Sequence, residues 1–372
     1  MKSIFYELIR VSIGIQDNLS RIPSESEWGM LYKMAEMQSL VGVCFAAIQR
    51  LGANSDEGYA RIGISKMQYF TWMGMAAKIQ QRNERVNQQC GELQERLAAD
   101  GLRSCILKGQ GVASLYSEYL RELRQSGDID VLVDCNRKDS LVYLRGIGME
   151  DLAWDYVHIH PRFFYDTEVE WHYRVSVDRN LWTSYKLQKF FAREKEEFFC
   201  GKSNFIGCSL VVPSNWMNLF YLLQHAYRHI FSEGLGLRQV MDLYFAFKTL
   251  NLSNEETTRL QKAVRDFGMV KFVTGLMWVL SHVFGLSINE WCPWTPNKRE
   301  GEFLLDDIMQ SGNMGKMDSR FRNISGSRAG KLLVVIRRTL HLATHYPAEA
   351  LSTPVYYAWH FIWKRIALLS DK

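Results

Sequence analysis

Cysteine is sparse in this sequence, and it is not paired. The 372 residues include only seven cysteines, an odd number, and no C-x-x-C pair occurs among them. Disulfide frameworks use even numbers of cysteines, and the common cysteine-rich zinc sites use C-x-x-C pairs. The pattern argues against both kinds of site. It predicts free thiols in a reducing compartment, and we expect a cytoplasmic protein.

Long apolar runs are absent as well. No stretch reaches the roughly 18 uninterrupted apolar residues of a membrane span. The N-terminal residues 1–19 lack the apolar centre and the small-residue cleavage site of a signal peptide. The sequence therefore predicts a soluble protein without a membrane partner.

Charge is not concentrated in any one part of the chain. The formal net charge is +5, and the lysines and arginines are spread along the sequence. A dedicated nucleic-acid binder usually gathers them in a stripe, and no strong stripe is present. The mild positive excess suits an anionic ligand such as a nucleotide. Neither the GxxxxGK[ST] loop nor the GxGxxG fingerprint occurs, so a phosphate would need a different binding loop.

Three regions differ in their residue patterns. We expect an N-terminal helical region over 1–100, a mixed α/β core over 101–213 and a C-terminal helical domain over 214–372. The serine and acids that begin at Ser24 are a helix-start signal. A second long helix is predicted over 66–99, and the Asp-Gly pair that follows it is a typical stop.

The central region supplies short strands, so the expected fold class is α+β, with a small mixed-sheet core flanked by N-terminal and C-terminal helical regions. Strands are predicted by apolar alternation, and helices by apolar residues at helical spacing. The predicted strands cover 103–109, 128–133, 157–165, 167–175 and 204–214, and the predicted helices 110–123, 138–146, 214–231 and 237–250. The polar segment 297–328, which carries Gly and Ser, is predicted to be a long loop.

Two acids stand one residue apart at the head of the strand predicted over 128–133. Side chains alternate along a strand, so Asp128 and Asp130 face one way and the neighbouring apolar residues face the other. Their α-carbons would lie roughly 7 Å apart. A divalent cation such as Mg²⁺ prefers one or two carboxylates, completed by waters and phosphates. A lone D-x-D is more often a solvated strand end, so the case for a metal site needs further residues.

A third acid comes from the strand TEVEWHYRV. Glu170 lies in its middle in an aromatic setting, where an unpaired acid would be costly. For that reason we choose Glu170, rather than Glu168 or Asp166, to complete the site. A structural pair between this strand's Glu170 and His172, or a salt bridge to Arg174, remains the alternative.

A glycine-containing turn supplies the complementary half of such a site. The segment Lys108-Gly109-Gln110-Gly111 lies between a predicted strand and a predicted helix. Glycine lets the backbone approach a ligand closely, and the N–H groups at a helix start can bind phosphate. Lys108 adds a positive charge. A metal–phosphate site is therefore predicted between this turn and the acids.

Together these residues resemble the nucleotidyltransferase superfamily that includes DNA polymerase beta. Within it they resemble the bacterial group described as uncharacterised nucleotidyltransferase, which is related to abortive-infection and toxin-type members. The resemblance is carried by ILKGQGVASLY, by the R-x-S-x-D-I-D-V-L-V segment 124–133 and by V-E-W-H at 169–172.

The resemblance implies a role for each matching residue. Asp128, Asp130 and Glu170 match the catalytic, metal-binding acids; the nucleotide-binding positions matched are Lys108, Gly109, Gly111, Arg124 and Ser126. The implied reaction is two-metal transfer of an NMP group from an NTP, with Mg²⁺ or Mn²⁺, to an acceptor hydroxyl on RNA, protein or a small molecule. Glu170 would share a cation with both aspartates or act as general base.

One departure from the family pattern leaves an alternative open. The usual Gly-Ser or Gly-Gly turn is here Lys-Gly-Gln-Gly, so Ser114 or Ser126 would have to replace the phosphate-side serine. The alternative is a catalytically silent nucleotide-binding or protein-interaction module with the same fold, for example a toxin–antitoxin or defence component.

Two further residue pairs stand at helical i, i+4 spacing. His225 and His229 have a spacing that can bind zinc, but no third ligand is marked, so a packed or capping role is favoured over substrate contact. Arg238 and Asp242 predict an ion pair along one helix face, with positioning of an acceptor as the alternative. No role follows from the sequence for His158 and His160.

Overall fold

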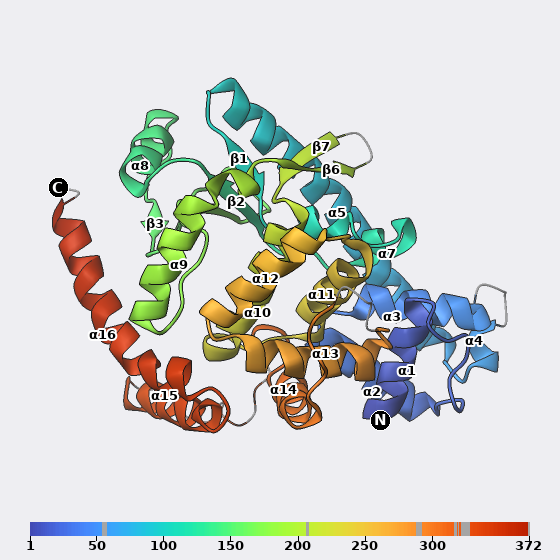
Figure 1. Ribbon diagram of the computed structural model, residues 1–372. Coiled ribbons are helices and arrows are strands. Elements are labelled where there is room, and N and C mark those ends of the chain that lie inside the picture. The colour runs from blue at the N-terminus through green and yellow to red at the C-terminus, as the bar shows by residue number, and fades with distance from the viewer. Residues whose placement is uncertain are drawn as a thin grey trace.

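The protein is described by a computed structural model that covers residues 1–53, 58–205, 208–287, 292–315, 318, 320 and 328–370. Figure 1 shows a small sheet in the upper part of the molecule, with helices gathered below it and along both sides. This mixed α+β arrangement is the expected fold class.

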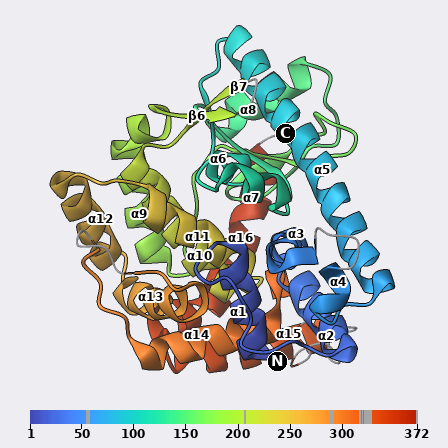
Figure 2. The same cartoon turned by 90° about the vertical axis from the view of Figure 1, so that its right-hand side faces the viewer.

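The N-terminal region is helical, as predicted. Its helices are α1 Lys2–Ser12, α2 Glu25–Met37, α3 Val41–Ile48, α4 Gly58–Arg61 and α5 Lys66–Ala99. The start of α2 is confirmed, because the Ser24 side chain accepts from the Glu27 N–H and the Glu27 carboxylate accepts from the Ser24 N–H. The ends of α5 are confirmed too, and Gly101 after it has φ +76°. Figure 2 shows α5 as a long diagonal that joins the strands at the top to the N-terminal helices at the bottom.

The central sheet has five strands in the order β1-β2-β5-β4-β3. Their bounds are β1 Ser104–Ile106, β2 Ile129–Val133, β3 Ala153–Trp154, β4 His158–His160 and β5 Val169–His172. β2 and β5 are parallel, whereas the other neighbours are antiparallel. The expected mixed sheet is therefore present, and its only parallel pair joins the two acid-bearing strands.

Three predictions for the central region and the helices beside it are corrected by the structure. The strand predicted over 204–214 is a hairpin of β6 Gly201–Phe205 and β7 Cys208–Val212. The two strands are antiparallel, and Phe205 pairs with Cys208. The helix predicted over 110–123 is two short helices, α6 Gln110–Ala113 and α7 Glu118–Leu123, because the extended backbone of Ser117 (ψ 150°) separates them.

The third correction concerns the loop predicted over 297–328, which begins as a helix, α14 Lys298–Ser311. Asn297 caps it by accepting from the Glu300 N–H. Leu304, Leu305 and Ile308 are buried at helical spacing, and the polar residues Glu300, Asp307 and Ser311 are buried as well. Residues 316, 317, 319 and 321–327 of that prediction lie outside the described residues.

Of the remaining helices, the first two lie in the central region and the others form the C-terminal region. They are α8 Arg137–Gly146, α9 Leu181–Arg193, α10 Asn215–Phe231, α11 Leu237–Thr249, α12 Asn254–Asp266, α13 Val270–Phe284, α15 Arg328–Ala343 and α16 Pro347–Ser370. In Figure 1, α16 runs along the left edge toward β3 and α8. Within the described ranges, no single helix is long and apolar enough to cross a membrane; α12 and α13 meet that criterion only as a pair bent by 118°.

The two faces of β2 meet different hydrophobic clusters. Ile129, Val131 and Val133 pack with residues of α5 and α8. Leu132 belongs instead to the larger cluster, which includes α10 and also joins α1 to α13. Asp130 therefore faces the α10 side of the sheet. Because residues 4–350 contribute to that one cluster, the boundaries near 100 and 213 remain predictions from residue pattern.

Candidate functional site

A cavity of about 460 Å³ lies on the α10 side of the sheet. Its lining includes Lys108, Gly109, Asp128, Asp130, His158, His160 and Glu170 from the sheet and its turns, and Arg124, Arg179, His225, Arg228, His229, Arg238 and Asp242 from facing segments. Tyr356, Tyr357 and His360 line it from α16. The structure thus gathers all three predicted acids and three of the five predicted nucleotide-binding residues around one cavity.

The parallel register of β2 and β5 decides which acid lies beside Asp130. Asp130 is the direct partner of Glu170 in the sheet. Glu168 is exposed, and Asp166 is bound by the side chains of Arg85 and Gln89. The choice of Glu170 among the three acids therefore agrees with the geometry.

Asp130 is 1% exposed and has one oxygen that is already bound. Its Oδ1 lies 2.9 Å from Lys108 Nζ and 3.1 Å from His172 Nε2. Its Oδ2 is buried and has no hydrogen-bond partner in the part of the chain that the structure describes. A buried carboxylate oxygen without a donor is costly, and a cation would satisfy it.

The charges around Asp130 shift one another's pKa. Burial opposes the charged form of Lys108, but the carboxylates of Asp130 and Asp128 outweigh it and raise the lysine pKa. Burial also opposes His172, yet hydrogen bonds to Asp130 and Glu170 raise its pKa to about 9. Against its own burial, Glu170 has a lowered pKa because His172 donates to it and Lys108 lies near. At neutral pH Glu170 is therefore ionised and His172 is protonated.

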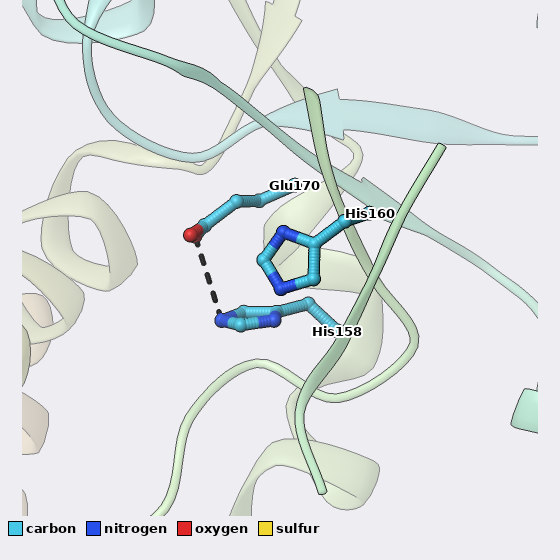
Figure 3. A group of neighbouring side chains, drawn as sticks. All are labelled: His158, His160 and Glu170. Atoms are coloured by element: carbon cyan, nitrogen blue, oxygen red, sulfur yellow. Dashed lines mark ion pairs between the residues drawn. The ribbon is translucent and has the colours of Figure 1, made fainter. Parts of the chain in front are cut away.

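Two groups of side chains bring metal-ligating atoms within 4.8 Å of one another. One is Asp130, Glu170 and His172, and the other is His158, His160 and Glu170. Asp128 is half-buried on the same cavity but belongs to neither group. Figure 3 shows the second group, with both imidazoles and the Glu170 carboxylate turned toward one another.

The glycine turn contributes unequally to the cavity. Gly109 lines it and has φ +59°, a conformation that favours glycine. Gly111 is buried away from it, and a Cβ there would lie 2.8 Å from the Ile106 carbonyl oxygen. Ser126 does not line the cavity, although its buried hydroxyl has no hydrogen-bond partner among the described residues. Ser114 does not line the cavity either, and its hydroxyl donates to the Gly111 carbonyl oxygen at 3.2 Å.

Arg124 is held by a buried ion pair. Its Nε lies 2.7 Å from Asp242 Oδ1 and its Nη2 lies 2.8 Å from Asp242 Oδ2, while Tyr116 donates to Oδ1 at 2.6 Å. Its Nη1 is buried and has no hydrogen-bond partner in the described ranges. The ion pair predicted between Arg238 and Asp242 is wrong, because Asp242 is bound by a residue from another segment.

Three further arginines, from segments outside the sheet, line the cavity. Arg179, Arg228 and Arg238 line it, and none of them forms an ion pair within the described part of the chain. The guanidinium of Arg179 stacks on Tyr356, 4.5 Å from the ring centroid. Unpaired guanidinium groups in a cavity are suited to phosphate or carboxylate groups of a ligand.

His225 and His229 bind each other in the structure. Their Nε2 atoms are 2.9 Å apart, and burial, with nearby Lys108 and Arg228, lowers the pKa of both rings. Both are buried in α10, which fits the packed role favoured from the sequence.

Sequence reasoning missed several residues of the cavity. Arg179, Arg228, Tyr356, Tyr357 and His360 line it, and His158 and His160 complete its metal-ligating side. Only the alternation of the two histidines is visible in the sequence. The others reach the cavity through helix packing, for which the sequence carries no local signal.

The comparison with protein families agrees with the resemblance. A crystal structure of an antigenic nucleotidyltransferase-like protein from Paracoccidioides brasiliensis is similar, with 14% sequence identity and a TM-score of 0.33, over 54% of this chain and 96% of that one. No curated protein matches the sequence. The family described as uncharacterised nucleotidyltransferase matches residues 24–285, well over half of the chain. The chain belongs to that uncharacterised nucleotidyltransferase family.

Proposed function

We propose that this protein transfers an NMP group from an NTP to an acceptor hydroxyl, with Mg²⁺ or Mn²⁺ held by Asp128, Asp130 and Glu170. The observation that carries the proposal is the register of β2 and β5, which sets Asp130 beside Glu170 on the cavity. One Asp130 oxygen has no donor among the residues that the structure describes. Carboxylates, with substrate phosphates and water, are the ligands that Mg²⁺ prefers. When bound, two such cations would supply charge at the attacking and leaving oxygens of the displacement.

The residues around the acids have separable tasks in this proposal. Phosphoryl transfer is catalysed chiefly by positioning and charge stabilisation. Lys108 and Arg238 lie near the carboxylates and would bind the phosphates, and Arg179 and Arg228 would extend that surface. These groups would compensate for the serine that the turn lacks.

Glu170 is assigned to cation binding rather than to base catalysis. A general base works best when its pKa lies near the working pH. The pKa of Glu170 is lowered by His172 and Lys108 despite its burial, so its carboxylate is a weak base. Its contribution is a fixed negative charge beside Asp130.

A thermal-shift assay with each NTP, with and without Mg²⁺, tests ligand binding. We expect stabilisation by an NTP that depends on Mg²⁺ and is lost in Asp130→Asn. Glu168→Gln is the matched control, because Glu168 is an exposed acid close in sequence to Glu170. A Mg²⁺-independent shift, or a shift that survives Asp130→Asn, would contradict the proposed role of the acids.

Label transfer tests catalysis and identifies the acceptor. A cell lysate is incubated with the protein and each α-³²P-NTP, and the labelled fraction is separated into RNA, protein and small molecules. We expect one class to be labelled by the wild type and by Glu168→Gln, but not by Asp130→Asn.

The second candidate is a catalytically silent nucleotide-binding or protein-interaction module. It is favoured by the contacts of Asp130 Oδ1, which Lys108 and His172 already bind, and by the missing serine of the turn. It predicts an NTP shift without Mg²⁺ dependence and no labelled acceptor in any fraction.

A further inference from the structure

Strand β4 carries two histidines to the edge of the cavity beside Glu170. His158 and His160 alternate along β4, so both point to the same face of the sheet. The antiparallel register pairs His158 with His172 and Ile159 with Trp171, and its next step sets His160 opposite Glu170. Asp130, Glu170 and His160 therefore form a row across three neighbouring strands.

The side chains of this group are already close to a ligating arrangement. His158 Nε2 lies 3.6 Å from Glu170 Oε2, and the rings of His158 and His160 are 4.7 Å apart between centroids. One donor atom from each of the three residues lies within 4.8 Å of the others. Metal–nitrogen and metal–oxygen bonds of about 2.0–2.2 Å place tetrahedral ligands roughly 3.4 Å apart, so only a small contraction is needed. The three groups converge from two strands (Figure 3).

The carboxylate of Asp155 lies near the more buried of the two histidines. Its Oδ1 lies 3.4 Å from His158 Nδ1 and accepts the N–H groups of Val157 and His158 at 2.7 and 3.0 Å. A carboxylate behind the far nitrogen of a metal-binding histidine is the usual second partner in such sites, because it fixes the ring orientation. Nε2 of His158 is then left to face Glu170.

We propose that His158, His160 and Glu170 bind a divalent transition metal of the zinc class, at a site beside the Asp128–Asp130 pair. Imidazole ligands suit Zn²⁺ and its neighbours in the first transition row, whereas Mg²⁺ favours oxygen ligands. Two histidines and a glutamate would leave a coordination position open, as in catalytic zinc sites, and all three residues line the cavity. Glu170 lies between the two groups and links them. The metal site does not depend on the nucleotidyl-transfer proposal.

The other histidine pair in the cavity is less suited to a metal. The Nε2 atoms of His225 and His229 contact each other. Among the described residues, no carboxylate forms a metal-ligating group with these two histidines. Metal binding by this pair is therefore the competing hypothesis, and a variant of the pair tests it.

The experiment uses the full chain, stripped with a chelator and titrated with Co²⁺ in excess Mg²⁺. Co²⁺ reports its ligands by visible absorption, and calorimetry with Zn²⁺ gives the affinity. We expect one Co²⁺ per chain that Mg²⁺ does not displace. Loss of a group that merely orients a ligand weakens metal binding 10–100-fold, so His158→Gln and His160→Gln should each weaken it by at least about 100-fold.

Two controls separate this site from the proposed Mg²⁺ site and from misfolding. Asp128→Asn should keep the Co²⁺ spectrum and lose the Mg²⁺-dependent NTP shift. His282→Gln removes an exposed histidine of α13 and should change neither. His160 is itself exposed, so its replacement is expected to leave the circular dichroism spectrum unchanged. A folded His160→Gln that retains wild-type Co²⁺ affinity, displacement by Mg²⁺, or loss of binding in His225→Gln alone would overturn the proposal.

Discussion

The buried ion pair between Arg124 and Asp242 gives the most direct test of how the cavity is held together. Arg124 is 2% exposed and Asp242 is 5% exposed, and two hydrogen bonds of 2.7 and 2.8 Å join them. Asp242→Asn leaves the guanidinium charge buried beside a neutral amide. Breaking a buried pair in this way costs about 3–5 kcal/mol. The remaining amide oxygen can still accept from Tyr116, so we expect about 3 kcal/mol.

The assay is equilibrium urea unfolding of the wild type and Asp242→Asn, compared at equal m-value. Asp306→Asn is the control, since the pair between Asp306 and Lys2 is 57% exposed on both sides and should contribute less than about 1 kcal/mol. A triple variant with Arg124→Met, Asp242→Leu and Tyr116→Phe removes the charges and the hydroxyl together. It should be about as stable as the wild type, or more stable. The reasoning is refuted if Asp242→Asn costs no more than Asp306→Asn.

Three further outcomes are expected. Because the pKa of His172 is raised to about 9, the stability that its protonated ring contributes is complete below about pH 6.5 and is lost as the pH rises through 9. The difference in unfolding free energy between wild type and His172→Gln, measured by urea unfolding, should therefore shrink by roughly 3 kcal/mol over that window. A constant difference would contradict the assignment. Gly111→Ala should lower the free energy of unfolding by about 1–3 kcal/mol, because the added Cβ overpacks against Ile106. Gly127→Ala should not lower it, because nothing lies within 4 Å of a Cβ built there, and equal urea midpoints for the two variants would refute this. Arg238→Gln should weaken Mg²⁺–NTP binding about tenfold or more in calorimetry, since a hydrogen bond to a charged group contributes about 1.5–3 kcal/mol. Unchanged affinity would show that Arg238 does not bind the phosphates.

Local signals in the sequence located several elements to within a residue. The capping box at Ser24 and the Asp-Gly stop after Ala99 act through hydrogen bonds between near neighbours, which the sequence shows directly. The alternation in 128–133 predicted β2, and it also predicted that the apolar residues face one core while Asp130 faces the other side.

The wrong predictions share a physical cause. The run over 204–214 mixes apolar residues with polar and small ones throughout, so the antiparallel pairing of β6 with β7 was hidden. The polar surface of α14 masked the stripe through Leu304 and Ile308. In each case the deciding contact lies across a turn or against another helix, where residue composition is not informative.

For the site, the sequence by itself determined the chemistry of single strands and turns. It indicated a pair of acids on the strand predicted over 128–133, a further acid on the strand predicted over 167–175, and a lysine–glycine turn. Only the tertiary structure decided their neighbours. The parallel pairing of β2 with β5 places Glu170 beside Asp130. The packing of α11 places Asp242 so that it forms its ion pair with Arg124 instead of Arg238. Strand register and helix packing depend on contacts between segments far apart in the chain, and periodicity within one segment carries no information about them.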